Sequence, residues 1–150
     1  MDVLEHLTQE HRKVEQLFGR LSGADKAGRA GLVDDLEQAP SVHIAVEDQH
    51  LYPIVEQVAG DEAEEEAETE HDLAREGIAK LRVMVDKPGF GAVVDMVSAG
   101  IGHHVQEEEN EIFPELRRKA AERIDRLDPE QLEPGLVTMT ELVTMVGTAP

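Results

Sequence analysis

The chain has 150 residues, which is enough for one domain with its own core. It contains no cysteine, and this excludes disulfides, thiolate catalysis and iron–sulfur clusters bound by the chain. A net charge of −19 argues against nucleic acids and anionic membranes as partners. The N-terminal residues are charged and no apolar run could cross a membrane, so we expect a cytoplasmic protein without a signal peptide.

Apolar residues recur at steps of three and four, which is the helical period, up to about residue 116. Glycine-containing breaks near Gly23, Gly28, Gly60 and Gly89 divide the pattern into four segments. These segments predict helices over about 4–21, 32–58, 67–85 and 94–116. Short connections make consecutive helices antiparallel neighbours. We therefore predict an all-α, up-down-up-down four-helix bundle over residues 1–126.

Residues 127–150 are expected to form a short C-terminal fifth helix and a tail. Asp128-Pro129-Glu130 is typical of a helix start, and the helix should run to about Met145. This segment could dock on the bundle or serve an interface, and we expect a monomer or a homodimer.

One pattern of histidine, glutamate and aromatic residues occurs twice, about 60 residues apart. Glu10-His11 recurs as Glu70-His71, and His43-x3-Glu47-x4-Tyr52-Pro53 recurs as His104-x3-Glu108-x4-Phe113-Pro114. The two matched prolines fall inside helical segments, as does Pro40, and each should kink its helix. The repetition indicates a bundle built from two equivalent helical hairpins.

The histidines of the two copies are predicted to meet at one height of the bundle. The midpoint between His11 and His43 is Ala27, and the midpoint between His71 and His104 lies beside Pro88, both within predicted turns. A four-residue step turns a helix by only about 40°, so each His-x3-Glu pair shares a face. Burying such polar groups without partners is costly, and metal ions would satisfy them together. The predicted metal ligands are His11, His43, Glu47, His71, His104 and Glu108.

Three further residues are candidates for outer partners or extra ligands. His50 and Glu111 follow the second- and fourth-helix histidines by seven residues, about 20° from the same face of an ideal helix. The alternative for both is a polar position near solvent at the bundle end. Tyr52 would point away from the site on an ideal helix and pack there. A kink at Pro53 could instead turn its phenol inward, as a ligand or a hydrogen-bond donor.

Residues next to the predicted ligands are expected to lie outside the metal site. Glu10 and Glu70 are offset by one residue from a histidine, so we expect them to be solvated or to be outer partners. His103 competes with His104, but only His104 places Phe113-Pro114 at the offset seen after His43.

The spaced set of motifs resembles the hemerythrin-like, or HHE cation-binding, family over about residues 1–125. The resemblance rests on Leu-x2-Glu-His, His-x3-Glu-Asp-x2-Leu-Tyr-Pro, a second Glu-His, and His-x3-Glu-Glu-x2-Ile-Phe-Pro. It implies a four-helix bundle holding two Fe ions, bridged by an oxo or hydroxo group and two carboxylates. The four histidines would be terminal ligands, and Glu47 and Glu108 would be bridging ligands.

One position departs from the pattern of the oxygen carriers in that family. They place two histidines one turn apart on the third helix, whereas Arg75 stands one turn after His71. A missing histidine would open one iron, which disfavours reversible dioxygen carriage and favours reaction with peroxide, nitric oxide or dioxygen.

The resemblance therefore implies a di-iron protein with a catalase-like, peroxidase-like or protective role. No separate catalytic base, nucleophile or organic cofactor motif is visible in the sequence. Two alternatives stay open: a non-catalytic module for dioxygen or iron sensing or storage, and a structural bundle without metal.

Overall fold

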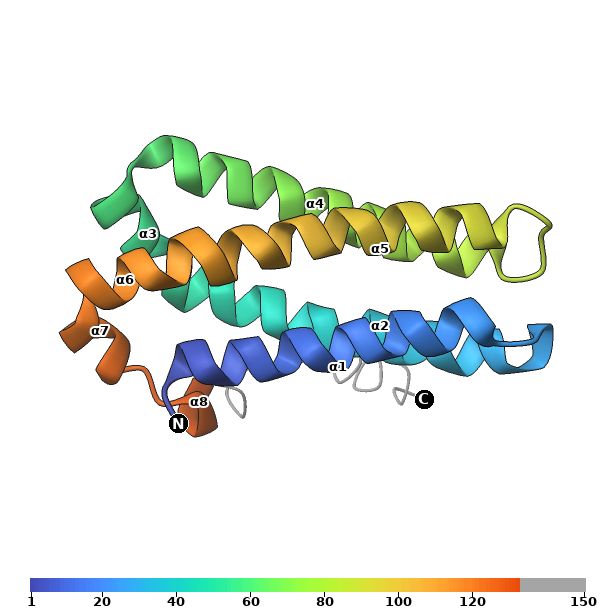
Figure 1. The fold of residues 1–150 in the computed structure, drawn as a ribbon, viewed down its shortest axis with the longest axis horizontal. Coiled ribbons are helices and arrows are strands. Elements are labelled where there is room, and N and C mark those ends of the chain that lie inside the picture. The colour runs from blue at the N-terminus through green and yellow to red at the C-terminus, as the bar shows by residue number, and fades with distance from the viewer. Residues whose placement is uncertain (133–150) are drawn as a thin grey trace, which may run out of the picture.

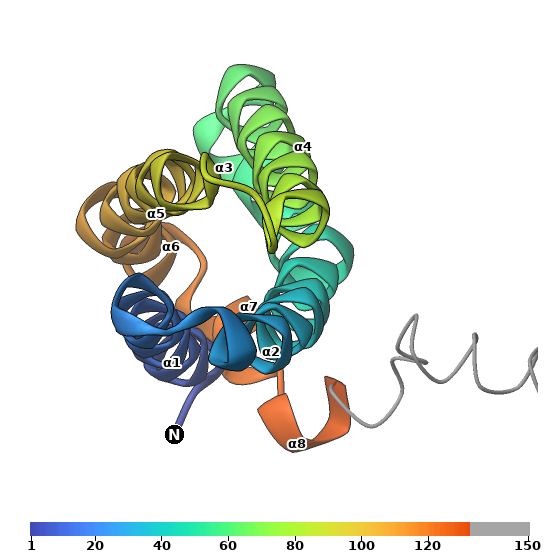
Figure 2. The same cartoon turned by 90° about the vertical axis from the view of Figure 1, so that its right-hand side faces the viewer.

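The computed structural model describes residues 1–132, and it is a bundle of four long helices. These are α1 (Val3–Gly23), α2 (Lys26–Val46), α4 (Asp61–Met84) and α5 (Phe90–Glu107). Each runs antiparallel to the one before it, and seen from the end they stand at the four corners of the bundle (Figures 1 and 2). The predicted all-α, up-down-up-down architecture is confirmed. In the part of the chain described, no helix combines the length and the apolar character needed to span a membrane.

The second and fourth helices each contain a π-helical turn. The turn η1 (Glu47–Leu51) joins α2 to α3 (Tyr52–Ala59), and η2 (Glu108–Ile112) joins α5 to α6 (Phe113–Lys119). Each turn ends directly before the first turn of the next helix, which contains Pro53 or Pro114. Inside a helix a proline has no N–H to donate, and its ring crowds the carbonyl of the residue four positions earlier. A wider turn relieves this crowding. The irregularities expected at these prolines are therefore π turns, whereas α2 continues as a helix through Pro40.

Two short helices close the described chain, α7 (Ala121–Asp125) and α8 (Pro129–Leu132). The last of these begins at the proline predicted to start the fifth helix. The rest of that predicted helix, up to about Met145, lies outside the described residues. Ile124 of α7 is buried, so α7 covers one end of the bundle.

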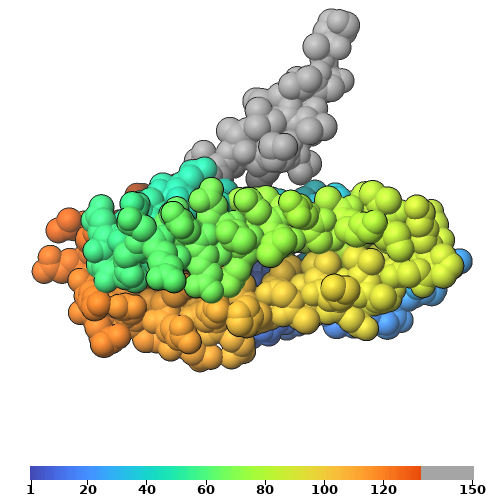
Figure 3. Space-filling model, turned by 90° about the horizontal axis from the view of Figure 1, so that it is seen from above, coloured from blue at the N-terminus to red at the C-terminus, as the bar shows by residue number. Residues whose placement is uncertain are grey.

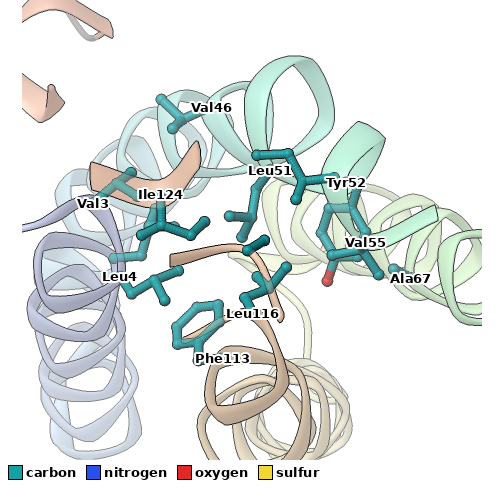
Figure 4. Packing of buried hydrophobic residues seen from close by; sticks show 13 residues of the cluster. Val3, Leu4, Val46, Leu51, Tyr52, Val55, Ala67, Phe113, Leu116 and Ile124 are labelled. Carbon is teal, nitrogen blue, oxygen red and sulfur yellow. The ribbon is translucent and has the colours of Figure 1, made fainter. Parts of the chain in front are cut away.

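The apolar core consists of two clusters with a polar layer between them. One lies near the N-terminal end of α1 and includes Leu4, Leu7, Leu51, Phe113 and Leu116 (Figure 4). The other lies toward the opposite end and includes Val14, Phe18, Leu36, Leu81 and Phe90. On α1 the residue between Leu7 and Val14 on the buried face is His11. The predicted metal ligands therefore occupy the layer between two apolar clusters, which shield them from bulk water at both ends.

The connection between α3 and α4 requires a glycine. Gly60 has φ +95°, and among residues 1–132 it is the single position with positive φ. A side chain there would strain the backbone, whereas glycine adopts this conformation freely. Three carboxylates follow in the first turn of α4, where the helix dipole favours negative charge: Asp61, Glu62 and Glu64.

Candidate metal centre

The six residues predicted as ligands meet in the middle of the bundle. Each long helix contributes one histidine, and the two glutamates are the first residues of the two π turns. Glu47 and Glu108 have no exposed surface, and His71 is 1 % exposed. His11 and His43 are also buried, and His104 is half-buried. Ionisable groups are rarely buried to this degree unless they are paired or bind a metal.

The histidines form two pairs that face each other through Nε2. The Nε2 atoms of His11 and His43 are 3.1 Å apart, and those of His71 and His104 are 3.0 Å apart. Two ligand atoms at right angles around a metal, each bonded at about 2.1 Å, would also lie about 3 Å apart. The spacing of both pairs therefore suits ligands of a common ion.

The carboxylate of Glu47 lies between the two histidine pairs. Its Oε2 is 2.9 Å from Nε2 of His71, and its Oε1 contacts Nε2 of His43. Neither oxygen has a hydrogen-bond partner, although both are buried. One carboxylate oxygen directed at each histidine pair is the arrangement that a bridging carboxylate requires.

Glu108 is placed differently from its counterpart. Its Oε1 lies 3.3 Å from Nε2 of His11 and 3.0 Å from Nε2 of His104, and this oxygen has no hydrogen-bond partner. Its Oε2 accepts a hydrogen bond of 3.1 Å from the hydroxyl of Tyr52. Glu108 therefore faces both histidine pairs with a single oxygen, whereas Glu47 uses two.

The donor atoms fall into two groups that share Glu47. One group holds His11, His43, Glu47 and Glu108, and the other holds Glu47, His71 and His104; the donor atoms of each group lie within 4.8 Å of one another. Three buried carboxylate oxygens in these groups lack hydrogen bonds, which is costly unless cations satisfy them. Imidazole and carboxylate donors without thiolate suit iron, manganese or zinc, so the residues present fit a two-metal centre.

Carboxylates contact the outer nitrogens of the two second-hairpin histidines. Asp48 Oδ1 is 2.7 Å from Nδ1 of His71, and Glu70 Oε2 is 2.5 Å from Nδ1 of His104. A carboxylate on Nδ1 fixes the ring orientation and leaves Nε2 as the donor, as is usual for metal-bound histidines.

The first hairpin repeats this arrangement at longer distances. Glu10 Oε2 lies 3.4 Å from Nδ1 of His43, and Glu109 Oε2 lies 3.9 Å from Nδ1 of His11. Glu10 and Glu70 thus face the outer nitrogens of histidines, which is one of the two roles expected for them. Asp48 and Glu109 were not predicted from the sequence. Both directly follow a predicted glutamate ligand, and this repeated position was the signal that could have identified them.

Arg75 contacts the carboxylate of Asp48, not the donor atoms of the candidate metal centre. Its Nη2 is 2.8 Å from Asp48 Oδ2 and its Nη1 is 3.0 Å from Asp72 Oδ1, with the side chain 48 % exposed. In the other half, the guanidinium of Arg12 contacts Glu109. The position that carries a second histidine in the oxygen carriers therefore supports Asp48 here.

The π turns explain why Tyr52 faces the site. Its backbone N–H bonds to the carbonyl of Glu47, five residues back, so the extra residue brings Tyr52 onto the face of Glu47. The ring is buried and lies perpendicular to the His71 ring, at 5.3 Å between centroids. In the other half, Phe113 stacks on His11 at 6.0 Å, without a hydroxyl. The tyrosine is thus one feature that makes the two halves unequal.

Two further candidates, His50 and Glu111, lie within these π turns. Among the described residues, neither belongs to a group of donor atoms that could hold a metal, and Glu111 is exposed. The prediction that they lie near the face of the ligands assumed an ideal α-helix, whereas both residues lie within π turns. A role as outer partners stays a prediction. His103 is exposed and pairs with Glu107 at 2.9 Å, which leaves His104 at the cluster.

Proton binding in the metal-free protein reflects this concentration of carboxylates. Burial alone would lower the pKa of His43, but the charge of Glu47 outweighs it and raises the pKa to about 10. Burial likewise lowers the pKa of His104, but the nearby carboxylates of Glu108 and Glu47 outweigh it and raise the pKa to about 11. Burial would raise the pKa of Glu47, yet the neighbouring histidines hold it well below its usual value. Burial and the charge of Glu108 raise the pKa of Tyr52, so its hydroxyl stays protonated as a donor.

One of the comparisons with known proteins gave a match, and that match agrees with this geometry. Neither the curated proteins nor the solved structures contain a significant match to the chain. The sequence does match one family model, described as the hemerythrin HHE cation binding domain, over residues 2–132. Because this match covers most of the chain, the protein belongs to the hemerythrin family of HHE cation-binding domains.

Proposed function

We propose that this protein is a cytoplasmic, non-haem di-iron protein that binds or reacts with peroxide, nitric oxide or dioxygen. The observation that carries the proposal is the position of Glu47, whose two buried oxygens lack hydrogen-bond partners and each face one pair of histidine Nε2 atoms. Membership of a cation-binding family and a donor set of imidazole and carboxylate both support iron.

The residues divide between two ion positions in this proposal. His11, His43, Glu47 and Glu108 would hold the first ion, and Glu47, His71 and His104 would hold the second. The Oε1 atom of Glu108 also faces His104 at 3.0 Å, so this carboxylate could bridge through one oxygen. Bound iron would supply Lewis-acid and redox chemistry.

The chain itself positions the groups that would bind the ions. The outer carboxylates hold the histidine rings, and Tyr52 holds one oxygen of Glu108. Arg75 supplies no imidazole, so the second position has one protein donor fewer than the corresponding position of the oxygen carriers. A position with fewer protein donors favours reaction with small oxidants over the reversible carriage of dioxygen, in a catalase-like, peroxidase-like or protective role.

The test is metal content per chain by mass spectrometry, with near-ultraviolet absorption, on protein expressed with iron. Two irons per chain with an oxo-to-iron charge-transfer band would support the di-iron centre. Turnover of hydrogen peroxide by the loaded protein would then support a catalytic role, and iron binding without turnover would favour sensing or storage. A chain that takes up no iron would refute the proposal.

Asp48→Asn is expected to weaken metal binding by about 10- to 100-fold at the position held by His71. The substitution removes the charged acceptor at 2.7 Å from Nδ1, and with it the support that orients this ring. Competition with a chelator of known affinity measures the loss. Asp72→Asn is the matched control, because Asp72 is 63 % exposed and contacts Arg75 outside the donor groups. Equal effects of the two substitutions would contradict a specific role for Asp48.

Tyr52→Phe is expected to change the visible spectrum of the iron-loaded protein while the iron content stays the same. The variant removes the hydrogen bond to Oε2 of Glu108 and gives both halves a phenylalanine at this position. A carboxylate that loses a hydrogen bond becomes a stronger donor to a metal. An unchanged spectrum and an unchanged reduction potential would show that the phenol serves packing alone.

A further inference from the structure

A pocket leads from the surface of the bundle to the histidine layer. Its volume is about 430 Å³, and its lining includes all four histidines of the candidate metal centre. Two large apolar side chains belong to the lining and are exposed, Leu73 of α4 at 61 % and Met96 of α5 at 77 %. Figure 3 shows the face where α4 and α5 lie along each other, with a hollow between them at mid-length. The pocket thus joins an apolar rim to a polar floor.

Small residues on both helices leave the space open. Ala74 and Gly100 line the pocket, and a Cβ atom added at Gly100 would meet no atom within 4 Å. Closer to the turn that joins α4 to α5, the two helices pack tightly, because a Cβ atom at Gly77 would lie 2.8 Å from Val97. The pocket is therefore bounded on one side by a helix contact that only glycine permits.

The volume is too large for the small oxidants alone. A water molecule occupies about 30 Å³ in the liquid, and a diatomic gas is of similar size. A pocket of about 430 Å³ has room for about fourteen molecules of this size, so two bound ions and one small oxidant would fill only part of it, and its volume falls within the range of sites for organic ligands. A diatomic molecule or hydrogen peroxide would leave most of the apolar lining without a contact.

The lining also defines the chemistry of the occupant. Apart from the histidines, the one ionisable residue of the lining is Glu70, whose carboxylate contacts Nδ1 of His104. No lysine or arginine lines the pocket, and the chain has a net charge of −19, so an anionic head group has no cation of the chain to pair with. An apolar chain would cover the rim at Leu73 and Met96, where large apolar side chains are otherwise exposed to water.

We propose that the pocket binds a neutral, medium-chain aliphatic molecule with one hydroxyl or hydroperoxyl head group. The chain lies between α4 and α5, and the head group points to the Nε2 atoms of the histidines. The orientation of the head group rests on the proposed di-iron function, because the ions would lie at the floor of the pocket. Binding of the aliphatic chain depends on the pocket alone.

The experiment is calorimetric titration of the full-length protein with 1-octanol, before and after loading with iron. Gly100→Leu places a side chain in the pocket and should weaken octanol binding at least tenfold. Gly91→Leu is the matched control on the same helix, because Gly91 has equal space around it and does not line the pocket. It should leave the affinity unchanged, and thermal unfolding of both variants checks that they fold.

Saturable binding at one octanol per chain, weakened by Gly100→Leu and not by Gly91→Leu, supports the inference. No saturable binding, or binding insensitive to Gly100→Leu, overturns it, and tighter binding of octanoate than of octanol overturns the neutral head group. Iron content of the same samples separates the two proposals. Octanol binding by a chain that takes up no iron refutes the di-iron function and leaves the pocket, whereas iron binding without octanol binding refutes the pocket alone.

Discussion

Replacing Glu47 with glutamine is expected to leave less than one iron ion per chain. Glu47 belongs to both groups of donor atoms, and its two oxygens contact opposite histidine pairs. Glutamine has nearly the same shape but carries no charge and offers one oxygen acceptor in place of two. Both ion positions therefore lose a donor from a single substitution. Metal content by mass spectrometry after loading with excess iron measures the effect.

Glu108→Gln is the informative control for this substitution. Glu108 has the same burial and the same place in the repeat, but its Oε2 is bonded to Tyr52. The second group of donor atoms, with Glu47, His71 and His104, does not include it. We expect this variant to retain at least one ion per chain. Equal loss of iron in both variants would contradict the unequal roles of the two carboxylates.

The bundle and its polar layer follow from features that are visible in the sequence. Four periodic segments and short connections predict antiparallel helices, and the duplicated His-x3-Glu motif predicts which residues meet. Histidines equidistant from a turn reach the same height whatever the details of packing. For this reason His11, His43, His71 and His104 could be placed together without a structure.

The orientation of residues after the glutamates could not be predicted in the same way. An ideal helix turns Tyr52 away from the site, whereas in the structure its hydroxyl donates a hydrogen bond to Glu108. The cause is one extra residue in each π turn, which rotates everything beyond it by about 100°. The prolines indicate that the helix is irregular there. A proline is compatible with a kink, a break or a π turn, so the sequence does not show which of the three occurs.

The outer carboxylates depend on contacts between hairpins, which periodicity does not describe. Asp48 on the first hairpin reaches His71 on the second, and Glu109 on the second faces His11 on the first. Both lie one residue beyond a buried glutamate, where an ideal helix predicts a solvated position. Their contacts depend on how closely neighbouring helices approach, and this distance is set by packing of the whole bundle.

The metal-free protein is expected to lose stability as the pH rises from about 6.5 toward 10. Burial lowers the pKa of His71, but the hydrogen bond that its Nδ1–H donates to Asp48 outweighs burial and raises the pKa to about 8; the pKa of His43 rises to about 10. Histidines in the unfolded chain titrate near 6.5. The folded protein thus holds protons that the unfolded chain has released, so the stabilisation is complete below pH 6.5 and is lost as the pH rises through the folded values. For His71 alone the difference corresponds to about 2 kcal/mol.

Loading with iron should remove this dependence, because metal ligands bind as neutral imidazoles and the ions replace the protons. Loading at pH 7 should therefore release protons, which an indicator dye in weak buffer detects. Denaturant unfolding at pH 6.5, 8 and 10, with and without iron, measures the stability. His104→Gln should flatten the profile of the metal-free protein, whereas His103→Gln should leave it unchanged, because His103 is exposed and lies outside the donor groups. A metal-free protein that is equally stable at pH 6.5 and 10 would mean that the four histidines are already neutral in the folded state, and that metal binding competes with no protons.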